Sequence, residues 1–262
     1  MDSLDSIREQ LEDRGLVKLE GLIEADSARA AYGSVVSLAK EHSLYVDGQW
    51  IKSTSRFGSA KPFRNALTKL SKSAGFPKLV GDHLAPMIEQ LVGDPVALMA
   101  PGQQILFSLP SDQRWSIPSD VWHTDLPKFA ERTTPGLQAF TFLDDVEPQG
   151  GGTLVVAGSH RLLNKFSSLS SKEVKQHLRR EEFFQMLFDS DRPEVTAPQD
   201  ATGRIGDVEL EVVELTGSVG DLYLMDLRVL HTPAPNSSEK ARFMPTCRFP
   251  TAEVALKLSE KN

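Results

Sequence analysis

The sequence contains one short motif with metal-ligand spacing, His123-Thr124-Asp125. In an extended backbone, the side chains of residues i and i+2 point to the same face of the chain. An imidazole nitrogen of His123 and a carboxylate oxygen of Asp125 can therefore bind the same ion. A distant histidine would complete a set of two histidines and one carboxylate on one side of a non-haem Fe(II), which leaves three coordination positions open. His231 is the natural third ligand, because it follows a strand-like region.

Taken alone, the His-x-Asp tripeptide is a weak signal, because the chain has six histidines and 36 acidic residues. The ordinary alternative is a surface or hydrogen-bonded histidine that happens to lie near an aspartate. Cys247 is the only cysteine, so the sequence offers neither a cysteine-based zinc site nor an intrachain disulfide.

Hydrophobic periodicity predicts the elements that position these residues. Up to about residue 100 the pattern is mostly helical, with helices expected near 4–14, 25–41 and 86–92 and a short strand at 16–19. From about residue 104 the period changes to two, which predicts strands at 105–109, 137–143, 153–157, 208–215, 219–226 and 241–249. Thr216-Gly217-Ser218 predicts a hairpin, and residues 171–190 predict an amphipathic helical insert. Many short strands behind a helical region indicate an antiparallel sandwich or barrel in one domain, 1–262.

Composition limits the partners. The chain has 262 residues and a formal net charge of −7, with no cluster of lysine and arginine, so neither a nucleic acid nor an anionic membrane is expected as a partner. No run approaches the roughly 18 apolar residues of a membrane span. The N-terminal segment is acidic where a targeting peptide would be basic, so we expect a cytoplasmic protein with a small-molecule substrate.

Several motifs occur in a fixed order along the chain: W-H-x-D at 122–125, L-D-D at 143–145, three glycines at 150–152, G-S-H at 158–160, G-D at 220–221, and His231. In this order they resemble the phytanoyl-CoA dioxygenase family of Fe(II)- and 2-oxoglutarate-dependent oxygenases. The resemblance covers most of the chain. It implies a mainly β fold with a double-stranded β-helix (jelly-roll, cupin-like) core at about 104–250, supported by the mostly helical residues 1–100.

The resemblance also implies the chemistry. His123, Asp125 and His231 would bind Fe(II), with 2-oxoglutarate and O2 as cosubstrates, and a small organic metabolite would be hydroxylated with release of succinate and CO2. The carboxylate ligand argues against halogenation, because iron halogenases of related fold have a small residue at that position. The histidine of G-S-H is not a ligand in the family, so His160 is expected to be structural.

The cosubstrate contacts are less closely specified. Arg242 stands eleven positions after His231, where the family has an arginine, and a guanidinium binds a carboxylate bidentately. Arg248 has the same strand parity and is the alternative anchor, and a surface ion pair is the ordinary alternative for Arg242. Ser108 and Gln104 alternate onto one face and are further candidate contacts. Thr141 is another, although an ordinary strand residue is the favoured interpretation there. Pro233 departs from the small polar residue that the family commonly has two places after the last histidine.

Candidate substrate contacts flank the His-x-Asp segment: Arg114, Trp115, Trp122 and Phe129, together with Lys128. Tyr45 and Trp50 could belong to a lid. Packing or surface positions are equally compatible with each of them. Two other functions remain open on the sequence: a jelly-roll metalloenzyme that does not use 2-oxoglutarate, and a non-catalytic jelly-roll binding module.

Overall fold

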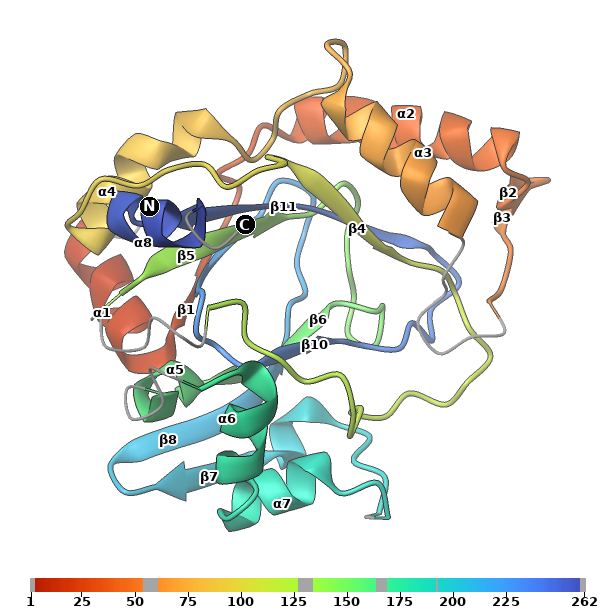
Figure 1. Cartoon of the computed structure of the whole chain (residues 1–262). Coiled ribbons are helices and arrows are strands. Elements are labelled where there is room, and N and C mark those ends of the chain that lie inside the picture. The colour runs from red at the N-terminus through yellow and green to blue at the C-terminus, as the bar shows by residue number, and fades with distance from the viewer. Residues whose placement is uncertain (1–2, 54–60, 127–133, 164–168, 192, 260–262) are drawn as a thin grey trace.

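The computed structural model describes residues 3–53, 61–126, 134–163, 169–191 and 193–259. Two antiparallel sheets face each other across the molecule (Figure 1). The larger sheet has the order β1-β9-β5-β11-β4, formed by Leu16–Leu19, Leu222–Asp226, Gly136–Thr141, Arg242–Pro250 and Gln104–Ser108. The smaller sheet has the order β10-β6-β8-β7, formed by His231–Pro233, Thr153–Ala157, Val208–Glu214 and Thr202–Ile205. The expected jelly roll is confirmed.

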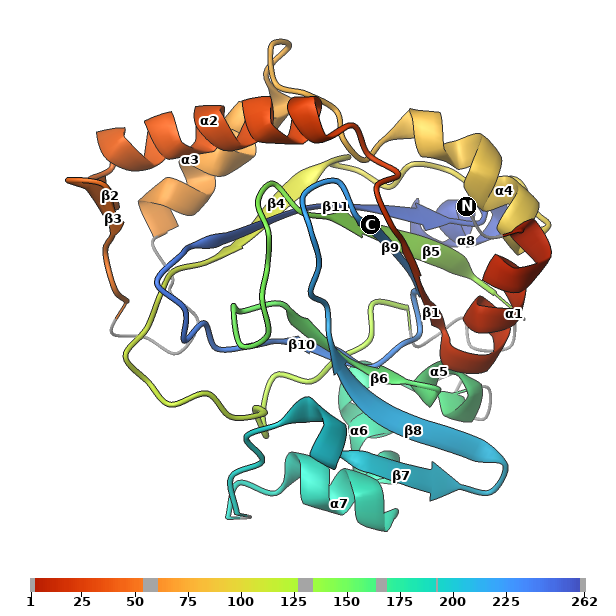
Figure 2. The same cartoon turned by 180° about the vertical axis from the view of Figure 1, so that it is seen from behind.

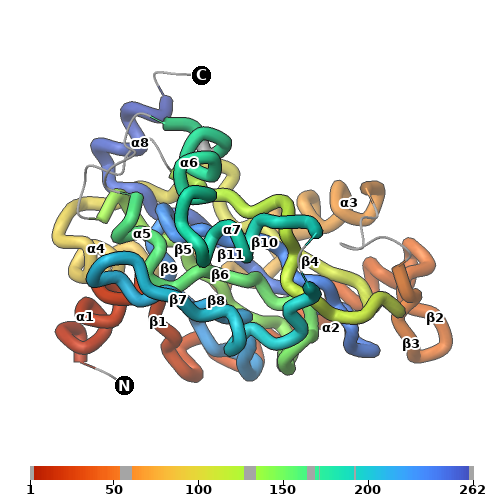
Figure 3. Tube along the Cα trace, turned by 90° about the horizontal axis from the view of Figure 1, so that it is seen from below, coloured from red at the N-terminus to blue at the C-terminus, as the bar shows by residue number. Residues whose placement is uncertain are grey.

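Helices cover the outer faces of both sheets (Figures 1 and 2). The larger sheet is covered by α1 (Leu4–Arg14), α2 (Ala25–Glu41), α3 (Lys61–Lys72) and α4 (Ala85–Val92). The smaller sheet is covered by α6 (Ser171–Leu178) and α7 (Glu182–Phe188), which lie on the viewer's side in the view from below (Figure 3). The remaining short elements are β2 (Tyr45–Val46), β3 (Gln49–Trp50), η1 (Asp82–Leu84), α5 (Ser159–Leu162), η4 (Pro198–Asp200) and α8 (Ala252–Ser259). Within the described residues, no helix combines the length and apolar character needed to cross a membrane.

Alternation along β11 separates two environments. Phe243, Cys247 and Phe249 pack into the cluster formed with the N-terminal helices. The intervening side chains therefore point the other way, into the space between the sheets. Met244 follows this rule, because it packs in a cluster with Val155 of the opposite sheet. The inner face of β11 is thus the surface on which a site between the sheets is built.

Most elements lie close to their predicted positions, and two differ. The expected hairpin at 216–218 is wrong, because β8 belongs to the smaller sheet and β9 to the larger one. Gly217 instead exchanges backbone hydrogen bonds with Val146 as the chain crosses between the sheets. The insert at 171–190 is helical as predicted, but it forms two helices, α6 and α7.

Candidate active site

His123 and His231 are brought together by backbone hydrogen bonds between two segments far apart in the sequence. The His123 N–H donates to the His231 carbonyl at 3.0 Å, and the His231 N–H donates to the His123 carbonyl at 2.9 Å. Residues that exchange both hydrogen bonds in an antiparallel pair place their side chains on the same face. The two ring centroids are accordingly 4.3 Å apart. His123 and His231 form an isolated β-bridge outside the named strand pairs.

His123 and His231 both use Nδ1 in a backbone contact, which leaves Nε2 of each ring for the site. Nδ1 of His123 lies 2.9 Å from the Val121 carbonyl, and Nδ1 of His231 lies 3.0 Å from the Val229 carbonyl. Because a carbonyl oxygen can only accept, each Nδ1 is a donor, and Nε2 is the ring nitrogen left to bind a metal. Burial lowers the pKa of His231 to about 4 in spite of the nearby Asp125. The His231 ring is therefore neutral at pH 7, as a metal ligand must be.

Asp125 supplies the third candidate ligand. One ligand atom from each of His123, Asp125 and His231 lies within 4.8 Å of the others. The distance from His231 Nε2 to Asp125 Oδ2 is 4.0 Å. Two imidazoles and one carboxylate that converge in this way match the ligand set of mononuclear non-haem iron sites. The three residues therefore form a candidate metal centre on donor chemistry as well as on spacing.

Arg248 holds the Asp125 carboxylate from β11. Its Nε donates to Oδ2 at 2.7 Å, and its Nη2 donates to Oδ1 at 3.2 Å. Burial alone would raise the pKa of Asp125, but His231 and Arg248 together hold that pKa below its ordinary value. Each carboxylate oxygen retains a second lone pair, so Asp125 can bind a metal while Arg248 fixes its direction. Strand parity placed Arg248 on the inner face, but as the alternative cosubstrate anchor rather than beside Asp125.

Arg242 lies at the other end of β11, about 20 Å from Arg248 along an extended strand. Its side chain is buried, and its Nε donates to the Gly151 carbonyl at 2.6 Å. Ser108 of β4 pairs directly with Arg242 across the sheet. Among the described residues, neither Arg242 Nη1 nor the Ser108 hydroxyl has a hydrogen-bond partner. Two adjacent buried donors of this kind fit one carboxylate group, so this position suits the distal carboxylate of 2-oxoglutarate.

The glycine-rich loop closes the space beside Arg242. Gly151 has a φ of +80°, and a Cβ at this position would collide with the Ser108 hydroxyl and with Asn236. The left-handed backbone and the close approach both require glycine here. Because Gly151 has no side chain, the loop can bring the Gly151 carbonyl within hydrogen-bond distance of Arg242.

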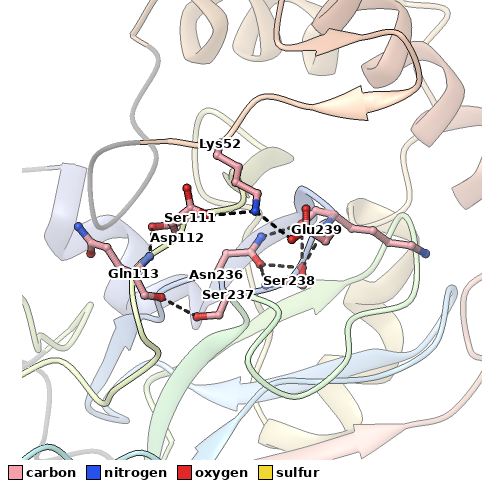
Figure 4. A network of polar contacts seen from close by, with 9 residues as sticks. Lys52, Ser111, Asp112, Gln113, Asn236, Ser237, Ser238 and Glu239 are labelled. Atoms are coloured by element: carbon pink, nitrogen blue, oxygen red, sulfur yellow. Dashed lines mark hydrogen bonds and ion pairs between the residues drawn. The ribbon is translucent and has the colours of Figure 1, made fainter.

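A network of polar contacts fastens the segment that leads into β11 (Figure 4). The Ser111 N–H donates to the Asn236 carbonyl at 2.9 Å. Lys52 Nζ lies 2.9 Å from an Asp112 oxygen and 3.0 Å from a Glu239 oxygen. These ion pairs are exposed and contribute little to stability. Their geometric effect is to tie the loop before Arg242 to the segment that follows Ser108.

Gln104 and Thr141 differ in how they relate to the site. Gln104 faces inward like Ser108, but it pairs with Thr246 near the middle of β11. The Thr141 hydroxyl donates to the Asp221 carbonyl at 2.8 Å. Thr141 also shares a face with Leu137 and Ala139, which pack against the helices. The structure therefore does not bring Thr141 to Arg242, in line with the ordinary strand role favoured for it.

The structure places the described candidate substrate residues in different surroundings. Trp115 and Trp122 are buried in the cluster beneath α6 and α7, and Trp122 Nε1 donates to the Pro118 carbonyl. Arg114 is exposed and borders a surface cleft of about 450 Å³ whose described lining includes Asp189 and Glu194. Phe129 and Lys128 lie outside the described residues. Tyr45 and Trp50 form the β2–β3 hairpin, where Trp50 packs on Phe243.

The G-S-H segment supports the histidine pair without joining it. The Leu230 N–H donates to the Ser159 hydroxyl at 2.9 Å, directly before His231. His160 Nε2 lies 3.0 Å from the Glu12 carbonyl, and burial lowers the pKa of this histidine. A neutral His160 therefore donates to the end of α1. This geometry agrees with the structural role expected for His160.

Comparison with known proteins agrees with the fold and the triad. Residues 12–244 match the sequence model of the phytanoyl-CoA dioxygenase (PhyH) family. The chain belongs to the phytanoyl-CoA dioxygenase family. It is an Fe(II)/2-oxoglutarate-dependent dioxygenase by class, with iron and 2-oxoglutarate as cofactor and cosubstrate. No curated protein sequence matches the chain.

Solved structures of the same fold include several enzymes of this class. The epimerase SnoN, in complex with Fe3+, alpha ketoglutarate and nogalamycin RO, is 19% identical with a TM-score of 0.56, over 95% of this family member and 84% of SnoN. AviO1 from Streptomyces viridochromogenes is 18% identical with a TM-score of 0.56, over 96% and 97% of the two chains. EctD from S. alaskensis is 15% identical with a TM-score of 0.54, over 95% of this chain and 77% of EctD. At these identities the comparison establishes the shared fold.

Proposed function

We propose that this phytanoyl-CoA dioxygenase family member hydroxylates a small organic metabolite at an iron centre held by His123, Asp125 and His231. The observation that carries the proposal is the pairing of two features on one inner surface. One is the convergent triad. The other is the pair of buried donors without partners, Arg242 Nη1 and the Ser108 hydroxyl. The first fits Fe(II), and the second fits the distal carboxylate of 2-oxoglutarate.

The protein residues have separate roles in this proposal. The triad holds the metal on one side and leaves the other side open, while Arg248 keeps Asp125 in one orientation. Arg242 and Ser108 bind the distal carboxylate, so the reacting end of the cosubstrate points toward the triad. Bound iron, 2-oxoglutarate and O2 together supply an oxidant for a substrate C–H bond and yield succinate and CO2. Arg242 and His231 are both buried, so the groups that would hold the two ends of the cosubstrate are shielded from bulk water.

The assignment can be tested by adding Fe(II) and 2-oxoglutarate to the metal-free protein without oxygen. We expect a weak visible metal-to-ligand charge-transfer band with the wild type and none with His231→Ala. His83→Ala is a matched control, because His83 is an exposed histidine away from the triad. If the wild type gives no band, or if the band persists in His231→Ala, the proposed site is wrong. A metal site without the band would favour an enzyme that does not use 2-oxoglutarate.

Hydroxylation is the finer part of the proposal. An aspartate at the third ligand position leaves no place for a halide, which favours transfer of oxygen to the substrate. SnoN, which shares the fold, is an epimerase. We therefore expect succinate release with a panel of small metabolites to identify the substrate, and mass spectrometry of the product to show a gain of one oxygen atom. A product of unchanged mass, or one that has lost two hydrogens, would contradict hydroxylation.

Two further expectations accompany the proposal. Because β1 from the N-terminal part is an edge strand of the larger sheet, we expect residues 1–262 to act as one domain. A shortened protein without residues 1–100 should therefore be unfolded, which circular dichroism would detect. We also expect the enzyme to act in the cytoplasm on a small molecule, with no nucleic-acid or membrane partner.

A further inference from the structure

Glu214 is a buried acidic residue that the proposed mechanism does not use. It ends β8, and its side chain is 7% exposed. Its Oε2 accepts from the Gln149 N–H at 2.7 Å, and its Oε1 accepts from the Gly152 N–H at 3.1 Å. Both carboxylate oxygens therefore accept hydrogen bonds from the backbone of the glycine-rich loop. Hydrogen bonds to an ionised acceptor are among the stronger ones in proteins.

The loop connects Glu214 to Arg242. Its N–H groups at Gln149 and Gly152 point to Glu214, whereas its carbonyl at Gly151 accepts from Arg242 Nε at 2.6 Å. Arg242 and Glu214 come from opposite sheets, on β11 and β8 (Figures 1 and 2). The loop is thus held from both sides, with the carboxylate on its donor side and the guanidinium on its acceptor side.

We infer that Glu214 is a positioning residue for the cosubstrate site, which fixes Arg242 by holding the glycine-rich loop in its bent shape. With Nε engaged by the Gly151 carbonyl, the guanidinium plane is fixed, and Nη1 remains the buried donor beside the Ser108 hydroxyl. A loosened loop would let the guanidinium rotate, and the two donors would no longer meet one carboxylate. Glu214 itself would touch neither the cosubstrate nor the metal.

The competing view is that Glu214 acts only through its charge. A negative charge near Arg242 would weaken binding of a second carboxylate, so its removal would strengthen 2-oxoglutarate binding. Two substitutions separate these effects. Glu214→Asp keeps the charge but shortens the side chain by one methylene, which breaks the contacts with the loop. Glu214→Gln keeps the length but replaces one accepting oxygen with an NH2 group that faces a backbone N–H.

The experiment measures 2-oxoglutarate binding to the Fe(II)-loaded protein without oxygen, through the charge-transfer band. It is done at pH 8, because burial raises the pKa of Glu214 to about 7 and the carboxylate is the accepting form. We expect both variants to bind 2-oxoglutarate at least about tenfold more weakly, since a lost hydrogen bond to a charged group is of that size. Fe(II) affinity should stay unchanged. Glu211→Asp is the matched control, as Glu211 is a partly exposed residue of the same strand that pairs with Arg14.

Hydrogen exchange gives the second readout. The Gln149 and Gly152 amides should exchange slowly in the wild type before 2-oxoglutarate is added, and faster in Glu214→Asp. Fast exchange in the wild type would show that the loop is not held and would overturn the inference even if the variants fail to fold. Tighter binding in Glu214→Gln, or wild-type affinity in Glu214→Asp, would also overturn it. The inference rests on the proposed function in one respect, that Arg242 binds 2-oxoglutarate. If the wild type does not bind 2-oxoglutarate at all, the proposed function fails first.

Discussion

Replacement of Arg242 by methionine should separate its role in ligand binding from any role in stability. Arg242 is buried, and in the described structure it makes one side-chain hydrogen bond, from Nε to the Gly151 carbonyl. Loss of that hydrogen bond costs about 1.5–3 kcal/mol. The same substitution removes a buried Nη1 donor without a partner, which itself costs about 1–3 kcal/mol in the ligand-free protein. Methionine fills a similar volume, so the two effects should cancel to within about 2 kcal/mol.

The effect on the complex should be larger. A carboxylate bound by Arg242 gains charge-assisted hydrogen bonds of about 1.5–3 kcal/mol each, and methionine makes none. Loss of the bond from Nη1 amounts to about 1.5–3 kcal/mol, or roughly 10–100-fold in 2-oxoglutarate affinity. Urea denaturation of the metal-free protein gives the stability term. Titration of the Fe(II)-loaded protein with 2-oxoglutarate in the absence of oxygen gives the affinity.

The test compares the change in unfolding free energy with the change in 2-oxoglutarate affinity. An arginine with a structural role would show the reverse pattern, with a stability loss well above 3 kcal/mol and wild-type affinity for 2-oxoglutarate. That result would refute the assignment of Arg242. Arg204→Met is the matched control, because Arg204 is an exposed arginine paired with Glu209 on the outer hairpin. It should change neither measurement by more than about 0.5 kcal/mol.

Three other outcomes are expected. Arg248→Gln removes both hydrogen bonds to the Asp125 carboxylate, so Fe(II) affinity measured against a competing chelator should fall about 10–100-fold, and an unchanged affinity would contradict its orienting role. Ser159→Ala leaves the buried Leu230 N–H without its acceptor, so the free energy of unfolding in urea should fall by about 1–3 kcal/mol. Burial raises the pKa of Glu214 from 4.5 to about 7, so its contribution to stability is full below pH 4.5 and is lost as pH rises through 7. Over that range the unfolding free energy of the wild type should lose up to about 3 kcal/mol relative to Glu214→Gln, and parallel pH profiles would contradict this.

The metal triad could be predicted because its geometry follows from short-range rules. His123 and Asp125 share a face through i, i+2 alternation, and the jelly-roll resemblance supplies His231. The same alternation, applied to Trp122, places it on the opposite face from His123. It is indeed buried in the cluster beneath α6 and α7. Substrate contact by Trp122 therefore stays a prediction.

Other residues could not be placed, because the sequence does not say which face of a doubly covered strand is the inner one. Every residue of β5 is buried, so its pattern does not distinguish Thr141, which faces the helices, from Gln138, on the other face. The hairpin expected at 216–218 failed for a related reason. A turn signal fixes a change of direction, but not whether the next strand joins the same sheet or the opposite one.

The two arginines of the site, Arg248 and Arg242, differ in the charged groups that surround them. Arg248 faces the ionised Asp125, so the triad and Arg248 together carry no net charge when both histidines are neutral. Arg242 has no acidic group in direct contact among the described residues, and burial lowers its pKa to about 10. It stays protonated at neutral pH and keeps its positive charge in a buried place, at a cost to the ligand-free protein.

Fe(II) adds two positive charges at the triad, so the dianionic 2-oxoglutarate meets positive charge at both of its ends only after the metal is bound. We therefore expect 2-oxoglutarate to bind the metal-free protein weakly and the Fe(II)-loaded protein much more tightly, and calorimetric titration with and without metal should show this order. Equal affinities in the two titrations would mean that Arg242 alone accounts for binding and that the triad does not contact the cosubstrate.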